Sequence, residues 1–197
     1  MASRAPHVQS PLARLLLGPA KQAIVGAMNA VPLTPDQLFT RLDALGIAHR
    51  TRAHAPVFTV AEAASVHADM PGGHCKSLFL KDKKGGFWLA VMIEDRRVAM
   101  TKLAAYLAAP RFSFGSADEL DALLGVHPGS VTPFALINDS GHRVIPVLDR
   151  AMLDYNPLNY HPLANDRTTA IAPADLLRFI AACGHQPRIV DLCGLER

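Results

Sequence analysis

The fold is indicated most clearly by residues 77–93, which read SLFLKDKKGGFWLAVMI. Apolar residues dominate both ends of this stretch, at Ser77–Lys81 and at Phe87–Ile93, and the segment between them consists of charged residues and glycines. Two apolar runs separated by a short turn-forming segment that contains glycine are typical of a β-hairpin. The stretch therefore predicts two strands joined by a hairpin.

Helical and extended patterns alternate on both sides of this hairpin. Thr34-Pro35 gives an N-cap followed by proline at the first helical position, and Gly46 ends the helix. Capping boxes at Thr59–Glu62 and Ser116–Glu119 open two further helices. We expect helices at 35–45, 59–68, 101–108, 117–124 and 173–183, extended segments at 47–53, 134–137, 144–148, 168–171 and 188–192, and a turn at 138–141.

Hairpin-linked strands with short helices between them favour the α+β class, a mixed α/β arrangement with a mainly antiparallel sheet. A chain of 197 residues suits one domain with a substantial core. Residues 1–33 differ from the rest, because basic residues are scattered among Ala, Leu, Ser and Pro and no acidic residue precedes Asp36. We interpret residues 1–33 as a loosely ordered N-terminal extension that precedes a single domain at 34–197.

The composition limits the class of protein and its partners. Half of the residues are hydrophobic, 19% are charged and the formal net charge is +3, which fits a globular protein and permits a polyanionic partner. The three cysteines form no Cys-x-x-Cys pair, which favours a reducing, cytoplasmic setting. No run reaches the roughly 18 apolar residues of a membrane span, and the histidines lack metal-ligand spacing. We therefore expect no membrane span, no metal site and no cofactor.

Three separated segments carry the candidate functional residues. The loop Gly129–Pro133 can present backbone N–H groups to a carbonyl oxygen, because glycine lets a ligand approach the backbone and proline stiffens the exit. Lys76 is a compact charge suited to a phosphate or a developing oxyanion. His161 can hydrogen-bond a substrate or move a proton near neutral pH. Each segment also has an ordinary interpretation, as a connecting loop, a solvated lysine and a structural histidine.

Taken in order, these segments resemble a known family. The pattern consists of KSLFLKD at 76–82, LGV at 124–126, GSVTPFALIND at 129–139, HPL at 161–163, Asn165 and Thr168. It is similar to the YbaK/PrdX family of aminoacyl-tRNA editing domains, and within it to the PrdX branch, the free-standing relatives of the editing insertion in bacterial prolyl-tRNA synthetase. The similarity spans Thr34–Leu192.

The resemblance implies a central barrel-like sheet surrounded by short helices, and an aminoacyl-tRNA deacylase that acts in trans on alanyl-tRNA(Pro). It implies tRNA as the partner, bound through its 3′-terminal adenosine and acceptor stem, and leaves prolyl-tRNA synthetase open as a second partner. An aminoacyl ester is already activated, so water oriented by a backbone loop and a ribose hydroxyl suffices without a metal or a covalent nucleophile.

The family pattern also implies a role for each matching residue of this sequence. Lys76 corresponds to the lysine near the 3′-terminal adenosine and its phosphate, and His161 to the histidine that borders the amino-acid pocket. Gly129 and Pro133 correspond to the ends of the substrate-positioning loop. The expected catalytic residues are Lys76, Gly129 and His161. The expected substrate-binding residues are Ser77, Ser130, Val131, Thr132, Pro133 and Asn165, with Ser77 standing where many relatives carry asparagine.

Two alternatives stay open at the level of the sequence. The volume of the pocket decides which amino acid is removed, so a deacylase for cysteinyl- or seryl-tRNA fits the same residues. A non-catalytic module that binds nucleic acid or an aminoacyl-adenosine also fits the mild basicity of the chain, although a strongly basic stripe and a helix-turn-helix pattern are both missing from the sequence.

Overall fold

The computed structural model describes residues 31–55 and 70–196. The expected helix at 59–68 and the first thirty residues of the expected extension lie outside these ranges. Within them, no helix has the length and the hydrophobicity needed to cross a membrane.

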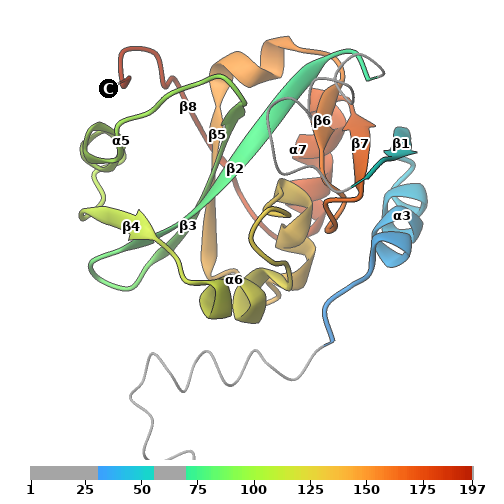
Figure 1. Ribbon diagram of the computed structural model, residues 1–197, viewed down its shortest axis with the longest axis horizontal. Helices are drawn as coiled ribbons and strands as arrows, with labels where there is room; N and C mark the ends of the chain where they lie inside the picture. Colours follow the sequence, from blue (N-terminus) through green and yellow to red (C-terminus); the bar gives the residue numbers. More distant parts are fainter. Residues whose placement is uncertain (1–30, 56–69, 197) are drawn as a thin grey trace, which may run out of the picture.

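The described chain folds into α-helices, two short 3₁₀ helices and strands that form one sheet (Figure 1). The helices are α3 (Pro35–Ala44), α5 (Met100–Tyr106), α6 (Ala117–Leu124) and α7 (Pro173–Ala182), with the 3₁₀ helices η1 (Pro133–Asn138) and η2 (Arg150–Asp154). The strands are β1 (His49–Ala53), β2 (Gly73–Asp82), β3 (Phe87–Ile93), β4 (Phe112–Phe114), β5 (Val144–Asp149), β6 (Leu158–Tyr160), β7 (Arg167–Ile171) and β8 (Arg188–Val190).

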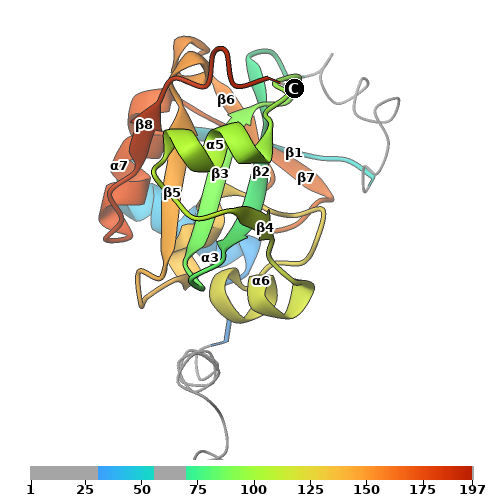
Figure 2. The ribbon, with the colours of Figure 1, turned by 90° about the vertical axis from the view of Figure 1, so that its left-hand side faces the viewer.

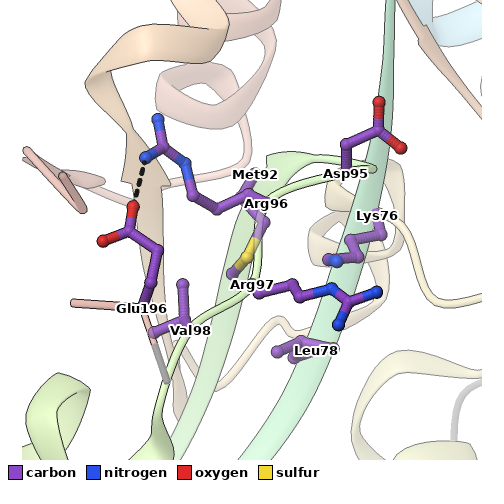
Figure 3. Close-up of a pocket in the computed structure, with 8 residues that line it drawn as sticks. All are labelled: Lys76, Leu78, Met92, Asp95, Arg96, Arg97, Val98 and Glu196. Atoms are coloured by element: carbon purple, nitrogen blue, oxygen red, sulfur yellow. Dashed lines mark hydrogen bonds and ion pairs between the residues drawn. The ribbon is translucent and has the colours of Figure 1, made fainter. Parts of the chain in front are cut away.

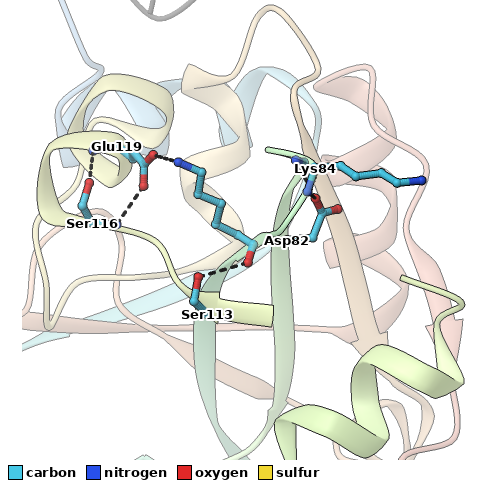
Figure 4. Close-up of polar contacts among 7 residues, drawn as sticks. Asp82, Lys84, Ser113, Ser116 and Glu119 are labelled. Atoms are coloured by element: carbon cyan, nitrogen blue, oxygen red, sulfur yellow. Dashed lines mark hydrogen bonds and ion pairs between the residues drawn. The ribbon is translucent and has the colours of Figure 1, made fainter. Parts of the chain in front are cut away.

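The predicted hairpin at 77–93 is confirmed as the antiparallel pair β2–β3, in which Ser77 faces Val91. Asp82 holds its turn together, because its carboxylate accepts hydrogen bonds from the backbone N–H groups of Lys84, at 2.8 Å, and Gly86, at 3.0 Å (Figure 4). The indole N–H of Trp88 donates to the same carboxylate at 3.0 Å. These three donors keep the pKa of Asp82 below its ordinary value, although burial opposes them.

The predicted helix starts at Thr34 and Ser116 are also confirmed. The Thr34 hydroxyl accepts a hydrogen bond from the Gln37 backbone N–H, and the Gln37 side chain accepts one from the Thr34 backbone N–H. The same reciprocal pair joins Ser116 and Glu119 (Figure 4). Such reciprocal caps satisfy amide groups that have no partner inside the helix.

The sheet is mixed, with the order β1-β7-β6-β2-β3-β5-β8 and with β4 beside β2. The α+β class is therefore confirmed, and antiparallel pairing prevails only narrowly, by four pairings to three among the described strands. The long connection from β3 through α5, α6 and η1 brings β5 back parallel to β3, which a hairpin cannot do.

Strand β2 crosses the middle of the molecule and joins both parts of the sheet (Figure 1). On the edge away from β3, it pairs with β6 only at Gly73 and His74, and with β4 only from Leu80 to Asp82. Among the described strands, none forms a ladder with that edge between Cys75 and Phe79. The Gly115 N–H donates to the Phe79 carbonyl at 3.1 Å, so the edge of β2 that no described strand pairs with, called the open edge below, runs from Cys75 to Leu78.

Two hydrophobic clusters cover the opposite faces of the β2–β3 hairpin. The first cluster contains Phe79 and Leu89 together with side chains of α3, α6, η1 and α7. The second cluster contains Leu80 and Ala90 and is covered by α5, which lies across that face of the sheet (Figure 2). Alternate residues of β2 therefore face different cores.

The strand expected at 134–137 is wrong, because this segment forms η1. Pro133 fixes the backbone at the first position of the 3₁₀ helix, and the Thr132 hydroxyl accepts a hydrogen bond from the backbone N–H of Phe134 at 3.3 Å. The Phe134 ring then packs edge-to-face against Phe179 and Tyr160, with ring centroids 5.4 and 5.9 Å apart. A short apolar run does not distinguish a strand from a buried helical turn, and the cap and the proline decide in favour of the helical turn.

Candidate functional site

The loop between α6 and η1 approaches the segment that follows β6. Gly129 has a φ of +91°, in the region that favours glycine, and a Cβ added there would lie 3.7 Å from the Asn165 side-chain nitrogen. The Ser130 N–H donates to the His127 carbonyl at 3.0 Å, which closes the turn. Two of the expected segments, the loop and the stretch containing Asn165, are thus brought together by the fold.

The far end of the loop is anchored in the protein interior. Thr132 is fully buried, Ser130 is 8% exposed, and Val131 packs against the first cluster. Within the described part of the chain, the backbone N–H groups of Gly129, Val131 and Thr132 have no hydrogen-bond partner. Thr132 is fully buried, but Gly129 is exposed and Val131 is half-buried, so their amides can donate hydrogen bonds to a ligand oxygen without first breaking bonds of their own.

His161 is fixed in one tautomer by its own loop. Its Nδ1 lies 3.1 Å from the Arg167 carbonyl, which can only accept, so Nδ1 carries the proton. Burial lowers the pKa of His161, and the hydrogen bond to Arg167 opposes this shift only in part. Near neutral pH the ring is therefore neutral with a lone pair on Nε2, for which the described residues provide no donor.

A second imidazole, which the sequence patterns did not single out, stands beside His161. The ring centroids of His54 and His161 are 6.2 Å apart, and the His54 Nε2 lies 2.9 Å from the Thr168 hydroxyl. His54 directly follows the expected extended segment at 47–53, and Thr168 begins the one at 168–171. If these two segments had been expected to pair, His54 would have been placed near the His161 loop from the sequence.

Lys76 lines a cavity of about 680 Å³ beside the connection from β3 to α5 (Figure 3). Its Nζ donates to the Glu94 carbonyl at 2.6 Å, and burial lowers the pKa of its ammonium group, with Arg97 adding to the effect. Arg96 lines the same cavity but is engaged in ion pairs with Asp149, at 3.2 Å, and Glu196, at 3.1 Å.

Arg97 differs from Arg96 in its contacts. Among the described residues it has no ion-pair partner, and Figure 3 shows its guanidinium group next to the Lys76 side chain. The carboxylates of Asp95 and Glu196 line the same cavity, so its three basic residues leave a small excess of positive charge. Together with the apolar walls formed by Leu78, Met92 and Val98, this excess is compatible with an anionic ligand that has an apolar part.

Lys76 and its neighbour Ser77 point to different faces of β2. Lys76 pairs in register with Met92 and shares the face of Leu78, toward the second cluster. Ser77 alternates to the other face, where its hydroxyl is buried and lacks a hydrogen-bond partner among the described residues. Val131 of the 129–133 loop packs against the first cluster, so Lys76 and the loop belong to opposite faces of β2, and no residue of the loop lines the cavity beside Lys76.

Comparison with known proteins gives the family to which this fold and its loop belong. Residues 54–179 match the family described as the aminoacyl-tRNA editing domain. All the candidate site residues lie inside this range, and the chain belongs to this family, as the sequence pattern predicted.

Named relatives agree with this assignment. The chain is 38% identical over 156 residues to the prolyl-tRNA synthetase associated domain-containing protein 1 of Bos taurus, covering 77% of this chain and 91% of that protein. It is 28% identical to the prolyl-tRNA editing protein ProX of Acetoanaerobium sticklandii, covering 79% of this chain and 95% of that protein.

A solved structure described as a candidate trans-editing enzyme for prolyl tRNA synthetase has the same fold. Its TM-score is 0.60 at 22% sequence identity, with 89% of this chain and 98% of that chain covered. The expected editing-domain fold is therefore confirmed.

Proposed function

We propose that this protein is a free-standing deacylase that hydrolyses alanyl-tRNA(Pro) in trans, in the cytoplasm, with the single domain at 34–197 sufficient for the reaction. The observation that carries the proposal is the approach of Gly129 to Asn165. It joins a loop with available backbone donors to the segment that holds His161, at a site inside an aminoacyl-tRNA editing domain.

The loop stabilises the charge that develops on the ester carbonyl oxygen. When water attacks the ester, that oxygen becomes negative, and amides fixed in advance bind it more strongly than the neutral ground state. The burial of Thr132 and Pro133, and the packing of Val131 against the first cluster, keep the amides of Gly129 and Val131 in place.

His161 orients the other reactant. Its Nε2 lone pair accepts a hydrogen bond from the attacking water or from the substrate ammonium group, because Nδ1 is committed to the Arg167 carbonyl. Since the ester is already activated, orientation of the water and stabilisation of the oxyanion account for the rate without a covalent intermediate.

The cavity beside Lys76 receives the phosphate of the 3′-terminal nucleotide. Lys76 and Arg97 supply the charge, and the apolar wall packs against the base or the ribose. Arg96 and Lys102 are weaker candidates for RNA contact, because Arg96 is paired with two carboxylates and Lys102 Nζ donates to the Glu196 carbonyl at 2.8 Å. The terminal nucleotide then crosses the open edge of β2 and places the ester at the loop.

Selectivity comes from exclusion of the larger, cyclic proline side chain, since steric exclusion discriminates better than one methylene of added contact. The relatives named for prolyl-tRNA synthetase support the tRNA(Pro) assignment and a prolyl-tRNA synthetase partner.

A panel of mischarged tRNAs tests the proposal. Purified full-length protein is incubated with alanyl-, cysteinyl- and seryl-tRNA, and release of each amino acid is followed together with binding of the same tRNAs. We expect the alanyl ester to be hydrolysed fastest. Faster release of cysteine or serine would change the substrate, and tight binding without release of any amino acid would identify a binding module.

A further inference from the structure

We propose that His54 is a positioning residue that holds His161 and its loop in the orientation required for deacylation. This inference rests on the proposed function. It starts from a backbone contact, in which the His54 N–H donates to the Asp166 carbonyl at 2.8 Å. That bond continues the β1–β7 ladder by one step beyond the Ala53–Arg167 pair and fixes the chain reversal between His161 and Arg167.

Both nitrogens of the His54 ring are engaged. Nδ1 lies 2.8 Å from the Ala55 carbonyl and must carry a proton, and Nε2 lies 2.9 Å from the hydroxyl of Thr168, which is buried. A neutral ring accepts a hydrogen bond from this hydroxyl, and a protonated ring donates to it. The orientation of His54 is therefore preserved in both charge states.

The two imidazoles are attached to one short segment of chain. His161 bonds to the carbonyl of Arg167, while His54 bonds to its neighbours Asp166 and Thr168. With ring centroids 6.2 Å apart and planes inclined by 55°, a shift of either ring moves the segment that holds the other. Three hydrogen bonds to consecutive residues thus determine where the His161 Nε2 points.

The groups around His161 shift its pKa in both directions. Burial and His54 lower the pKa of His161, whereas Glu94 and Asp166 raise it. The Asp166 carboxylate is itself paired with Arg167, at 2.8 Å, which reduces its influence. His54 thereby helps to keep Nε2 unprotonated, in addition to holding the ring.

Histidine-ring NMR of the free protein tests this role without any substrate. In ¹H–¹⁵N spectra recorded from pH 5 to 8, we expect His161 of the wild type to be the Nδ1-protonated tautomer and to titrate below its ordinary pKa. In His54→Ala, both tautomers should be populated and the titration should move to higher pH. His54→Gln retains a group that reaches the Thr168 hydroxyl, so it should keep the wild-type tautomer although the neighbouring charge is lost.

Kinetics with alanyl-tRNA(Pro) give the second measurement. We expect His54→Ala to lower kcat roughly tenfold with little change in KM, as for loss of one positioning hydrogen bond, and His54→Gln to recover most of the rate. A wild-type His161 spectrum in His54→Ala would overturn the inference.

If His54→Ala does not fold, His54→Asn replaces it in the same NMR measurement. This variant retains only the contact with Ala55, so both tautomers of His161 should be populated. If the spectra change as expected while no charged tRNA is hydrolysed, the proposed function is wrong and the positioning role of His54 stands.

Discussion

At the scale of single residues, Gly129 combines a positive φ angle, which favours glycine, with a position in the proposed substrate-binding loop. Its φ of +91° is unfavourable for any side chain, yet an added Cβ meets only Asn165, at an ordinary contact distance of 3.7 Å. The position therefore tolerates a methyl group sterically, and the requirement for glycine comes from the backbone and from the space a substrate needs.

Gly129→Ala should lower the free energy of unfolding by about 1 kcal/mol, the usual penalty for a left-handed alanine. It should also slow deacylation, because the methyl group projects between the loop and Asn165. Gly85→Ala is the matched control, since Gly85 has a φ of +86° in the hairpin turn with nothing within 4 Å. Denaturant unfolding should show similar losses for both variants. Equal activity of the two variants would contradict the assignment of the loop.

Lys76→Ala should raise KM for charged tRNA and reduce its salt dependence, because one phosphate contact is lost. For single-stranded RNA the slope of log affinity against log salt should fall by about 0.7. Lys84→Ala, in the exposed hairpin where Figure 4 shows the side chain extending away from the labelled contacts, removes the same charge at a distance. A salt slope that changes as much in Lys84→Ala as in Lys76→Ala would place the RNA elsewhere.

At the scale of elements, η1 determines the geometry of the loop that precedes it. The Thr132 hydroxyl caps this 3₁₀ helix from a fully buried position. Thr132→Val keeps the shape of the side chain and removes the hydroxyl, so the Phe134 N–H loses its partner inside the core.

We expect Thr132→Val to destabilise the fold by about 1 to 2 kcal/mol in urea unfolding, as for loss of a helix cap. Deacylation should fall with it, because the loop amides lose their anchor. Thr132→Ser retains the hydroxyl and should keep most of the activity. If the valine variant were as active as the serine variant, the cap would have no part in positioning the loop.

Elements with local signals could be predicted from the sequence, and elements that depend on distant partners could not. Capping residues at Thr34 and Ser116 marked helix starts that the structure confirms. The strands β4 and β6 have three residues each and form by pairing with distant strands, β4 with β2 and β6 with β7 and β2, which no local pattern records. The apolar run at 134–137 was ambiguous, and its proline and cap made it helical.

At the scale of the whole molecule, the pairing register of β2 with β3 determines which face of the sheet Lys76 occupies, a point that the sequence pattern left open. The motifs placed Lys76 and the loop in one site, but the alternation along β2 directs Lys76 toward the second cluster and the loop belongs to the first. A side chain's face depends on which residues pair across the sheet, and a one-residue shift would reverse it.

Stability of the whole fold should decrease as the pH falls below about 6.5. His185 is 4% exposed, with its Nε2 3.7 Å from an Asp139 carboxylate oxygen, and burial lowers its pKa although Asp139 opposes the shift. The unfolded chain then binds a proton more readily than the folded one, so the stabilisation is complete above the unfolded pKa of about 6.5 and is lost as the pH falls toward the lower folded pKa. His161 adds an effect of the same sign.

Urea unfolding at pH 7.5 and 5.5 measures this dependence above the range in which carboxylates titrate. His185→Gln should have a smaller difference between the two pH values than the wild type. His127→Gln is the control, because the His127 side chain is 84% exposed. If the difference in unfolding free energy between the two pH values were unchanged in His185→Gln, another group would be responsible for the pH dependence.

We propose a single site, formed by the 129–133 loop with Asn165 and His161, that hydrolyses a tRNA ester and selects the amino acid by its size. Release of amino acid from alanyl-tRNA(Pro) and from prolyl-tRNA(Pro), measured side by side with the full-length protein, tests it most directly. We expect alanine to be released at least about tenfold faster than proline, the range expected of a steric pocket. Equal rates, faster release of proline, or no release from either tRNA would contradict it.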